Sequence, residues 1–182
     1  MILKPRTTCR ICNSTQLSTI MSLGDQHIAA YTPRASDPNP ILDKFPLELI
    51  RCTEPDCGLV QLRHSTPGDV LYERYFYRSG INKTMTENLK EIAMQAISKV
   101  ELQDNDIVLD IGCNDGTLLK NYQGKNLRSV GIDPAKNMAE FSKECGADII
   151  VDYFNSKSFT DHYSNEKAKI ITSISMFYDL ED

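Results

Sequence analysis

The chain has 182 residues, 41% of them hydrophobic and 25% charged, which suits a globular protein of one or two domains. Its net charge of -5 and pI near 5.2 weigh against a nucleic-acid partner, because nucleic-acid-binding proteins usually carry a basic face. No stretch approaches the roughly 18 apolar residues that span a bilayer, and residues 1–5 lack the apolar core of a signal peptide, so we expect a cytoplasmic protein with a small-molecule substrate and no membrane partner.

The first predicted module is built around four cysteines. They form a CxxC pair, Cys9 and Cys12, and a CxxxxC pair, Cys52 and Cys57. In a reducing compartment such pairs favour metal ligation over disulfides, and four thiolates suit a tetrahedral structural zinc with no open position for catalysis. Asn13 and Gly58 follow the two pairs and tolerate positive φ, so each turn can point backbone N–H groups at a sulfur. Residues 1–68 are therefore predicted to be a loop-rich zinc-binding module.

Other roles for the cysteines and histidines stay open at this point. Either His27 or His64 could replace one thiolate. The four paired cysteines could instead be buried or disulfide-bonded, with coincidental spacing. Cys113 and Cys145 lie outside the pairs and are expected in the core.

Residues 69–104 are predicted to form an aromatic linker and a leading helix. The linker contains Tyr72, Tyr75, Phe76 and Tyr77, a cluster that could simply pack it against the following domain. Thr84 and Glu87 predict a capping box at the start of the helix. Apolar residues then recur at helical spacing as far as Val100, which predicts one buried face.

The pattern of residues 105–182 predicts a Rossmann-like α/β domain with parallel strands. An apolar run from Ile107 ends in Asp110-Ile111-Gly112 and suits a strand buried on both faces. Further strands are predicted at 127–132, 148–151 and 170–175, and helices at 116–122 and 135–145. Four strands in roughly 80 residues are fewer than a complete doubly wound domain has, so we expect a truncated, N-terminal part of one.

The turn after the first predicted strand has features of a cofactor site. Gly112 and Gly116 let the backbone approach a ligand closely. A dinucleotide fingerprint would also require glycine where Asn114 and Thr117 stand, and this mismatch disfavours NAD. Gly112, Asn114 and Gly116 remain candidate contacts for another nucleoside cofactor.

Acidic residues around this turn favour S-adenosylmethionine (SAM). Asp110 and Asp115 would repel a pyrophosphate, whereas SAM has no phosphate and carries a cationic sulfonium and an ammonium group. Asp133, at the end of the second strand, is placed to accept hydrogen bonds from both ribose hydroxyls, and Asp152 could contact the adenine amino group. The alternatives are another nucleotide, or a purely structural turn with aspartates that only cap helices.

Taken together, these motifs resemble the bacterial sugar C-methyltransferases, which act on nucleotide-linked deoxy-keto sugars. The similar segments are 9–12, 51–52, 57–61, 75–85, 109–119 and 173–182. The family usually has CxxC where this chain has the CxxxxC of Cys52 and Cys57. The resemblance implies an N-terminal zinc-binding region, a central SAM domain and a further C-terminal domain absent from this sequence, with the sugar held between them.

The resemblance also implies a reaction and residue roles. A base removes the proton beside a ketone, and the enolate attacks the SAM methyl group. Tyr75 and Tyr77 would act as catalytic residues that line the pocket and orient substrate or cofactor. Ser79 and Asn82 would approach the methionine end of SAM, and Ser173 completes the cofactor-binding set. The base is expected from a Glu-His motif beyond the end of this sequence, so the chain would be a fragment of the enzyme.

Two other functions share these features. A zinc-finger RNA methyltransferase would use the same metal and turn, although the acidic balance speaks against it. A non-catalytic module that binds zinc and SAM is the second. The sequence does not specify the sugar, the methylated carbon, the nucleotide or the oligomeric state.

Overall fold

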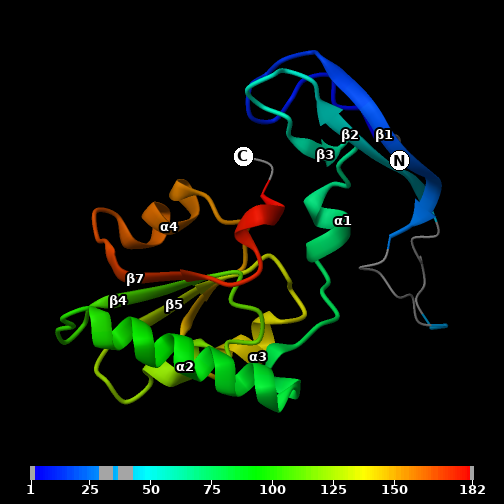
Figure 1. The fold of residues 1–182 in the computed structure, drawn as a ribbon. Helices are drawn as coiled ribbons and strands as arrows, with labels where there is room; N and C mark the ends of the chain where they lie inside the picture. Colours follow the sequence, from blue (N-terminus) through cyan, green and yellow to red (C-terminus); the bar gives the residue numbers. More distant parts are fainter. Residues whose placement is uncertain (1–2, 29–34, 37–42, 181–182) are drawn as a thin grey trace. The chain divides into compact units, whose positions relative to one another are not determined.

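The computed structural model describes residues 3–28, 35–36 and 43–180. The chain divides into two compact units, Met1–Leu71 and Tyr72–Asp182, whose elements are labelled in Figure 1. Among the described helices, none has the length and apolar character needed to cross a membrane.

The first unit contains a three-stranded antiparallel sheet in the order β1-β2-β3. Its elements are β1 (Leu17–His27), β2 (Lys44–Cys52), β3 (Val60–Leu62) and the short helix α1 (Gly68–Tyr72). The core is small, with Phe45 and Ile50 of β2 buried in it. β1 is exposed along almost its whole length and lacks the alternation of buried and exposed residues from which a strand is predicted. Residues 1–68 were expected to be rich in loops, and this sheet was not predicted.

The second unit is built on a four-stranded parallel sheet in the order β6-β5-β4-β7. The strands are β4 (Ile107–Ile111), β5 (Arg128–Ile132), β6 (Asp148–Ile150) and β7 (Ala168–Ser173). Every residue of β4 is buried, as expected for a strand covered on both faces. The predicted α/β class with parallel strands is confirmed.

Helices cover both faces of this sheet. The helical elements are η1 (Ser79–Ile81), α2 (Lys83–Lys99), η2 (Leu119–Tyr122), α3 (Ala139–Lys143), α4 (Ser156–Tyr163) and η3 (Phe177–Asp179). On one face, Leu89 and Ala93 of α2 share a buried cluster with Val108 of β4. On the other face, Phe159 of α4 packs against a cluster that includes Leu109 of β4. Figure 1 accordingly shows α2 and α4 on opposite faces of the sheet.

The start of α2 differs from the prediction. Its N-cap is Asn82, whose side-chain oxygen accepts a hydrogen bond of 3.1 Å from the Met85 N–H. The helix begins at Lys83, so Thr84 already lies inside the first turn and cannot be the capping residue. The capping box predicted from Thr84 and Glu87 is therefore wrong.

Two predicted helices are much shorter than expected. The segment predicted as 116–122 is helical only in η2, and the segment predicted as 135–145 only in α3. Side chains occupy the backbone groups that a longer helix would need. Asn121 donates hydrogen bonds to two carbonyls of its own turn, and Ser142 Oγ donates to the carbonyls of Met138 and Ala139. Such local bonds compete with regular helix.

Alanine substitutions at two glycines test how tightly the second unit is packed. Gly116 and Gly124 both have φ of +74°, but a Cβ atom at Gly116 would lie 2.7 Å from Cys145 Sγ, whereas one at Gly124 would meet open space. Gly124→Ala should lower the free energy of unfolding by about 1 kcal/mol through backbone strain alone. Gly116→Ala should lower it by about 1–3 kcal/mol more, because overpacking is added. Urea denaturation measures both, and equal losses would contradict the close approach at Gly116.

Candidate metal and cofactor sites

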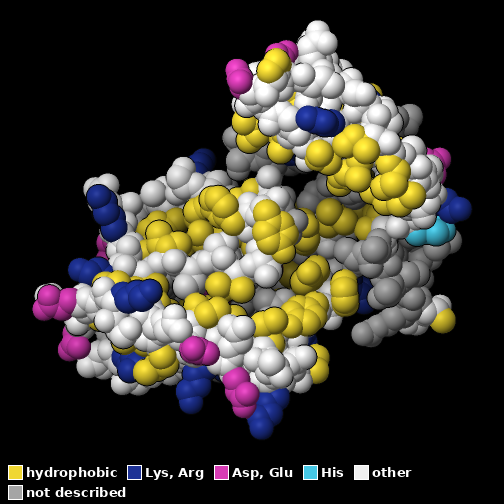
Figure 2. Space-filling model, in the orientation of Figure 1, with side chains coloured by type: hydrophobic (Ala, Val, Ile, Leu, Met, Phe, Trp, Pro, Cys, Tyr) yellow, Lys and Arg dark blue, Asp and Glu magenta, His cyan; other side chains and the backbone are white. Residues whose placement is uncertain are grey.

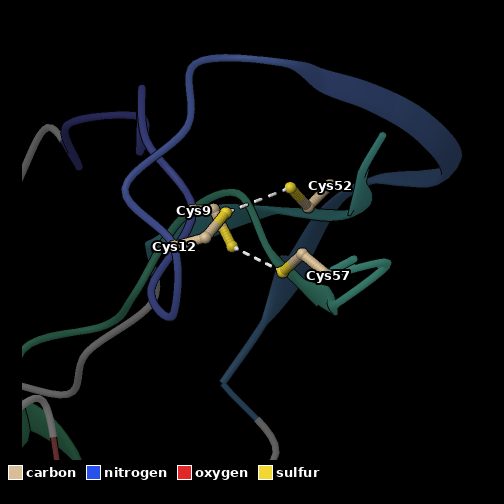
Figure 3. Close-up of side chains that lie close together, drawn as sticks. All are labelled: Cys9, Cys12, Cys52 and Cys57. Atoms are coloured by element: carbon tan, nitrogen blue, oxygen red, sulfur yellow. Dashed lines mark hydrogen bonds between the residues drawn. The ribbon is translucent and has the colours of Figure 1, made fainter. Parts of the chain in front are cut away.

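The four paired cysteines converge within the first unit. Cys9 and Cys12 precede β1, Cys52 ends β2, and Cys57 lies in the turn between β2 and β3. Figure 3 shows their side chains pointing toward one another. The Sγ atoms of Cys9 and Cys57 are 3.6 Å apart, those of Cys12 and Cys52 are 3.5 Å apart, and all four lie within 4.8 Å.

These separations fit a tetrahedral metal site and exclude disulfides. Zn–S bonds of about 2.3 Å place the sulfurs of a tetrahedron about 3.8 Å apart, whereas a disulfide requires about 2.05 Å. Each of the four cysteines is a free thiol. Neither His27 nor His64 is a member of this cluster. The ligand set predicted from the two pairs is thus brought together in the geometry that zinc prefers.

Backbone groups of the turns stabilise negative charge on the sulfurs. Hydrogen bonds from the backbone of Cys12 and Ile11 outweigh burial and lower the pKa of Cys9 to about 6. At Cys52 a bond from the Glu54 backbone also lowers the pKa, but burial and the neighbouring sulfurs raise it to about 12. The turns therefore favour a thiolate at Cys9, whereas burial and the neighbouring sulfurs disfavour one at Cys52. A bound cation is what would allow all four thiols to ionise together.

The two turns have the predicted backbone conformation. Asn13 has φ of +58° and Gly58 has φ of +65°, so both residues that follow the pairs are left-handed. Ser14 Oγ donates a hydrogen bond of 2.7 Å to Glu54 Oε1 and links the two turns. Glu54, which lies between Cys52 and Cys57, therefore connects the two turns.

We predict that the chain binds one zinc ion through these cysteines. Cys52→Ala should reduce the zinc content from about one ion per chain to almost none, because structural zinc needs four protein ligands. Elemental analysis after dialysis measures the content. Cys145→Ala is the matched control, since Cys145 and Cys113 are buried in the core of the second unit, as the sequence led us to expect. Zinc retained by Cys52→Ala would disprove the site.

The candidate cofactor site lies in the second unit, where β4 ends. Gly112, Asn114 and Gly116 all adopt the left-handed conformation, with φ of +72°, +51° and +74°. A Cβ atom at Gly112 would lie 2.8 Å from Met176 Cγ, so this position requires glycine. The turn therefore brings its backbone against the segment that follows β7.

Asp110 is a buried carboxyl at the end of β4. It is 4% exposed, and its Oδ1 accepts a hydrogen bond of 2.7 Å from Thr172 Oγ1 on β7. Burial raises the pKa of Asp110 to about 7; the bond from Thr172 opposes this shift, and the charge of Asp133 adds to it. A cation bound nearby would favour the ionised form.

The Asp133 carboxylate, directly after β5, is bonded to the turn after β4. Its Oδ2 accepts the Asn114 N–H at 2.8 Å, and its Oδ1 accepts the Ala135 N–H at 2.8 Å. Burial raises the pKa of Asp133, although these two hydrogen bonds act in the opposite direction. Each carboxylate oxygen has a second lone pair that can accept a hydrogen bond from a ligand hydroxyl.

The segment of residues 75–82, called the strap below, is bonded to the same turn. Asn114 Oδ1 accepts the Ser79 N–H at 3.0 Å, and Asn114 Nδ2 donates to the Tyr77 carbonyl at 2.9 Å. Two of the predicted site residues, Tyr77 and Ser79, are thereby held beside the predicted cofactor turn.

The other predicted site residues differ in their contacts and in their exposure. The backbone of Tyr75 exchanges two hydrogen bonds with the Asn137 side chain, at 2.9 and 2.7 Å. The side-chain oxygen of Asn82 caps α2. Asp152 follows β6 and is exposed. Ser173, at the end of β7, has a buried Oγ without a hydrogen-bond partner among the described residues.

Exposed aromatic residues occur on the strap and after β7. Phe76 and Tyr77 belong to the strap, and Phe177 and Tyr178 to η3. Figure 2 shows hydrophobic side chains, in yellow, on the surface of the molecule. Large exposed rings are typical of surfaces that bind a ligand or a partner.

Two residues of the site were not identified from the sequence. Thr172 donates a hydrogen bond to Asp110, and no local sequence motif predicts a side-chain contact between two neighbouring strands. Asp115 was considered only for its charge, whereas the structure buries it to 3% exposure and surrounds it with hydrogen-bond donors. Its position in the predicted cofactor turn, between Asn114 and Gly116, could have identified it as a candidate site residue.

The buried Asp110 predicts a pH dependence of stability. Its folded pKa of about 7 lies above the ordinary value of 3.8. The group therefore stabilises the fold fully at low pH, and this contribution is lost as the pH rises from about 4 through about 7. Asp110→Asn stays neutral and should gain about 2–4 kcal/mol over the unsubstituted chain between pH 4 and pH 8. Urea denaturation measures the gain, with Asp106→Asn at the other end of β4 as control; parallel pH profiles would refute it.

Comparison with known proteins identifies relatives of both units. Residues 9–72 match a family described as "Putative zinc binding domain". The chain is 28% identical over 149 residues to C-methyltransferase NovU of Streptomyces niveus, covering 82% of this chain and 35% of that protein. It is 27% identical over 180 residues to phosphoethanolamine N-methyltransferase 1 of Triticum aestivum, covering 93% and 34%. The chain thus spans about a third of the length of these curated relatives.

A similar solved structure is coclaurine N-methyltransferase bound to N-methylheliamine and SAH. The identity is 23%, the TM-score is 0.38, and the match covers 58% of this chain and 31% of that one.

Proposed function

We propose that this chain, which is related to bacterial C-methyltransferases, supplies the zinc-binding and SAM-binding parts of an enzyme that methylates a carbon of a nucleotide-linked deoxy-keto sugar. The observation that carries the proposal is the turn after β4, where the N–H of left-handed Asn114 donates to the Asp133 carboxylate and Asp110 is buried at the end of the strand. The similarity to NovU over most of the chain supports carbon as the methylated atom.

The sheet offers an edge on which an extended nucleoside can lie. The strand order β6-β5-β4-β7 sets Asp152, Asp133, Gly112 and Ser173 after successive strands. Neighbouring strands are about 4.8 Å apart, so three steps span about 14 Å. We assign the ribose hydroxyls to Asp133 and the adenine amino group to Asp152. We assign Ser173, whose buried Oγ has no hydrogen-bond partner among the described residues, to the opposite end of the ligand.

Charge favours SAM over a phosphate-containing cofactor. Asp110 is buried and Asp133 is half-buried, and burial raises the pKa of each. The two carboxylates repel each other when ionised, and an anionic ligand would add to this repulsion. A cationic sulfonium and ammonium would relieve it. We assign the methionine end to Ser79 and Asn82 of the strap; since the Asn82 side chain caps α2, its backbone or a second lone pair would make the contact.

The proposed reaction converts a carbon into a nucleophile. A base removes the proton next to the ketone, and the electron pair passes to the carbonyl oxygen to form an enolate. The enolate carbon then attacks the methyl group, the S–CH3 bond breaks, and its electrons stay on sulfur. In this reaction Tyr75 and Tyr77 orient the sugar or the cofactor, which supplies part of the rate by positioning. The zinc site contributes a rigid first unit and no chemistry.

Calorimetry with SAM tests the cofactor assignment. We expect this chain to bind SAM and not NAD, and Asp133→Ala to weaken SAM binding by about 10–100-fold, because it removes charge-assisted hydrogen bonds to the ribose. Asp161→Asn, an exposed aspartate on α4, is the control that should bind normally. Preference for NAD over SAM would overturn the assignment.

Methyl transfer to nucleotide-linked keto sugars tests the substrate class in the full-length gene product. Methylation of carbon, found by mass spectrometry and NMR of the product, is the expected result. Transfer to nitrogen or oxygen of the same sugars, or to RNA alone, would refute the proposed substrate and reaction.

A further inference from the structure

We propose that Asp115 is a positioning residue that fastens the strap onto the cofactor turn and thereby sets SAM affinity without touching SAM. The inference rests on the proposed function for its ligand, but the latch itself is built from contacts that exist without any ligand. We call the contacts of Asn114 and Asp115 with the strap the latch.

The Asp115 carboxylate is buried in a way that requires partners. It is 3% exposed, its Oδ1 accepts a hydrogen bond of 2.6 Å from Thr117 Oγ1, and its Oδ2 accepts the Gly80 N–H at 2.9 Å. Arg78 Nε lies 3.7 Å from the same Oδ2. A buried carboxylate that loses such partners is strongly destabilised, so Asp115 and the strap hold each other in place.

The strap side of the latch is shaped for this contact. A Cβ atom on Gly80 would lie 2.7 Å from Thr117 Oγ1 and 2.9 Å from Asp115 Oδ2, so no other residue fits without displacing the strap. The Arg78 guanidinium carbon lies 3.6 Å from the centre of the Phe141 ring, which adds a cation–π contact from α3. Two strap residues, Arg78 and Gly80, therefore contact the same carboxylate.

The latch is continuous with the proposed ribose-binding carboxylate. Asn114 bonds Tyr77 and Ser79 through its side chain and bonds Asp133 through its N–H. Strap, turn and Asp133 thus form one hydrogen-bonded unit. When the strap is fastened, the groups assigned to both ends of SAM are held before the ligand arrives. When it is not, SAM binding must itself order the strap, which lowers affinity.

Four variants of the chain test the latch by calorimetry and by trypsin cleavage. Asp115→Ala removes the acceptor, Asp115→Asn keeps an acceptor oxygen without the charge, and Gly80→Ala pushes the strap off while leaving the turn unchanged. Asp106→Asn is the control, because its carboxylate also accepts a backbone N–H, from Gln103, at the opposite end of β4. The rate of cleavage after Arg78 reports local opening of the strap, and the rate of cleavage after Lys120 reports opening of the rest of the second unit.

The expected result is selective. In Asp115→Ala and Gly80→Ala, cleavage after Arg78 should become several-fold faster than cleavage after Lys120, and SAM binding should weaken about tenfold, as for a strap fastened a tenth of the time. For Asp115→Asn, the rate of cleavage after Arg78 and the affinity for SAM should both lie between those of Asp115→Ala and of the unsubstituted chain. Addition of SAM should slow cleavage after Arg78. Unchanged affinity in both Asp115 variants and Gly80→Ala, or equal acceleration at every site, would overturn the latch.

The two proposals fail in different ways. If the unsubstituted chain does not bind SAM, the cofactor assignment falls, while site-selective cleavage in the variants still supports the latch. If it binds SAM and all four variants bind equally well, the latch falls and the cofactor assignment stands.

Discussion

A parallel sheet collects the carboxyl ends of its strands along one edge, and the turn after β4 can lie there only because its residues accept positive φ. Gly112 and Gly116 do so without a Cβ atom, and Asn114 is among the side chains that tolerate it. The left-handed turn aims the Asn114 N–H at Asp133 and frees its side chain for the strap. The arrangement of the whole candidate cofactor site follows from this one backbone constraint.

The first unit depends on a different interaction, because its apolar core is too small to stabilise three strands alone. Phe45 and Ile50 are buried, but β1 is exposed almost throughout. Four thiols within 4.8 Å supply the missing cross-link once a cation ionises them. Left-handed Asn13 and Gly58 aim backbone groups at the sulfurs, so here too positive φ positions the functional atoms. A metal bound by these thiols would therefore be coupled to folding, which is the property of a structural site and not of a catalytic one.

Acidic groups are buried in the second unit at a cost to its stability. Asp110 has a pKa raised to about 7, and Asp115 is 3% exposed, yet both keep hydrogen-bond donors around them. A fold under selection for stability alone would place apolar residues there. A buried carboxyl such as Asp110 is the pattern expected where a bound cation offsets the cost of burial, whereas Asp115 is matched by hydrogen bonds from Gly80 and Thr117. The exposed aromatic residues of the strap and η3 also favour a surface that binds a ligand or a partner.

The sequence by itself determined the parallel α/β class, the cysteine pairs and the left-handed positions Asn13 and Gly58, because apolar runs, short spacings and glycine or asparagine turns are local signals. It failed for the sheet of the first unit, whose exposed β1 carries no hydrophobic alternation. It also misjudged the helices after β4 and β5, where side chains of Asn121 and Ser142 bond backbone carbonyls. Only the tertiary structure decided how the strap meets the turn, since Asn114 and Asp115 bond residues 35 positions earlier in the chain. No local pattern encodes such a contact; it arises when packing of α2 against the sheet brings two distant polar segments together and buries them, so that each must satisfy the other.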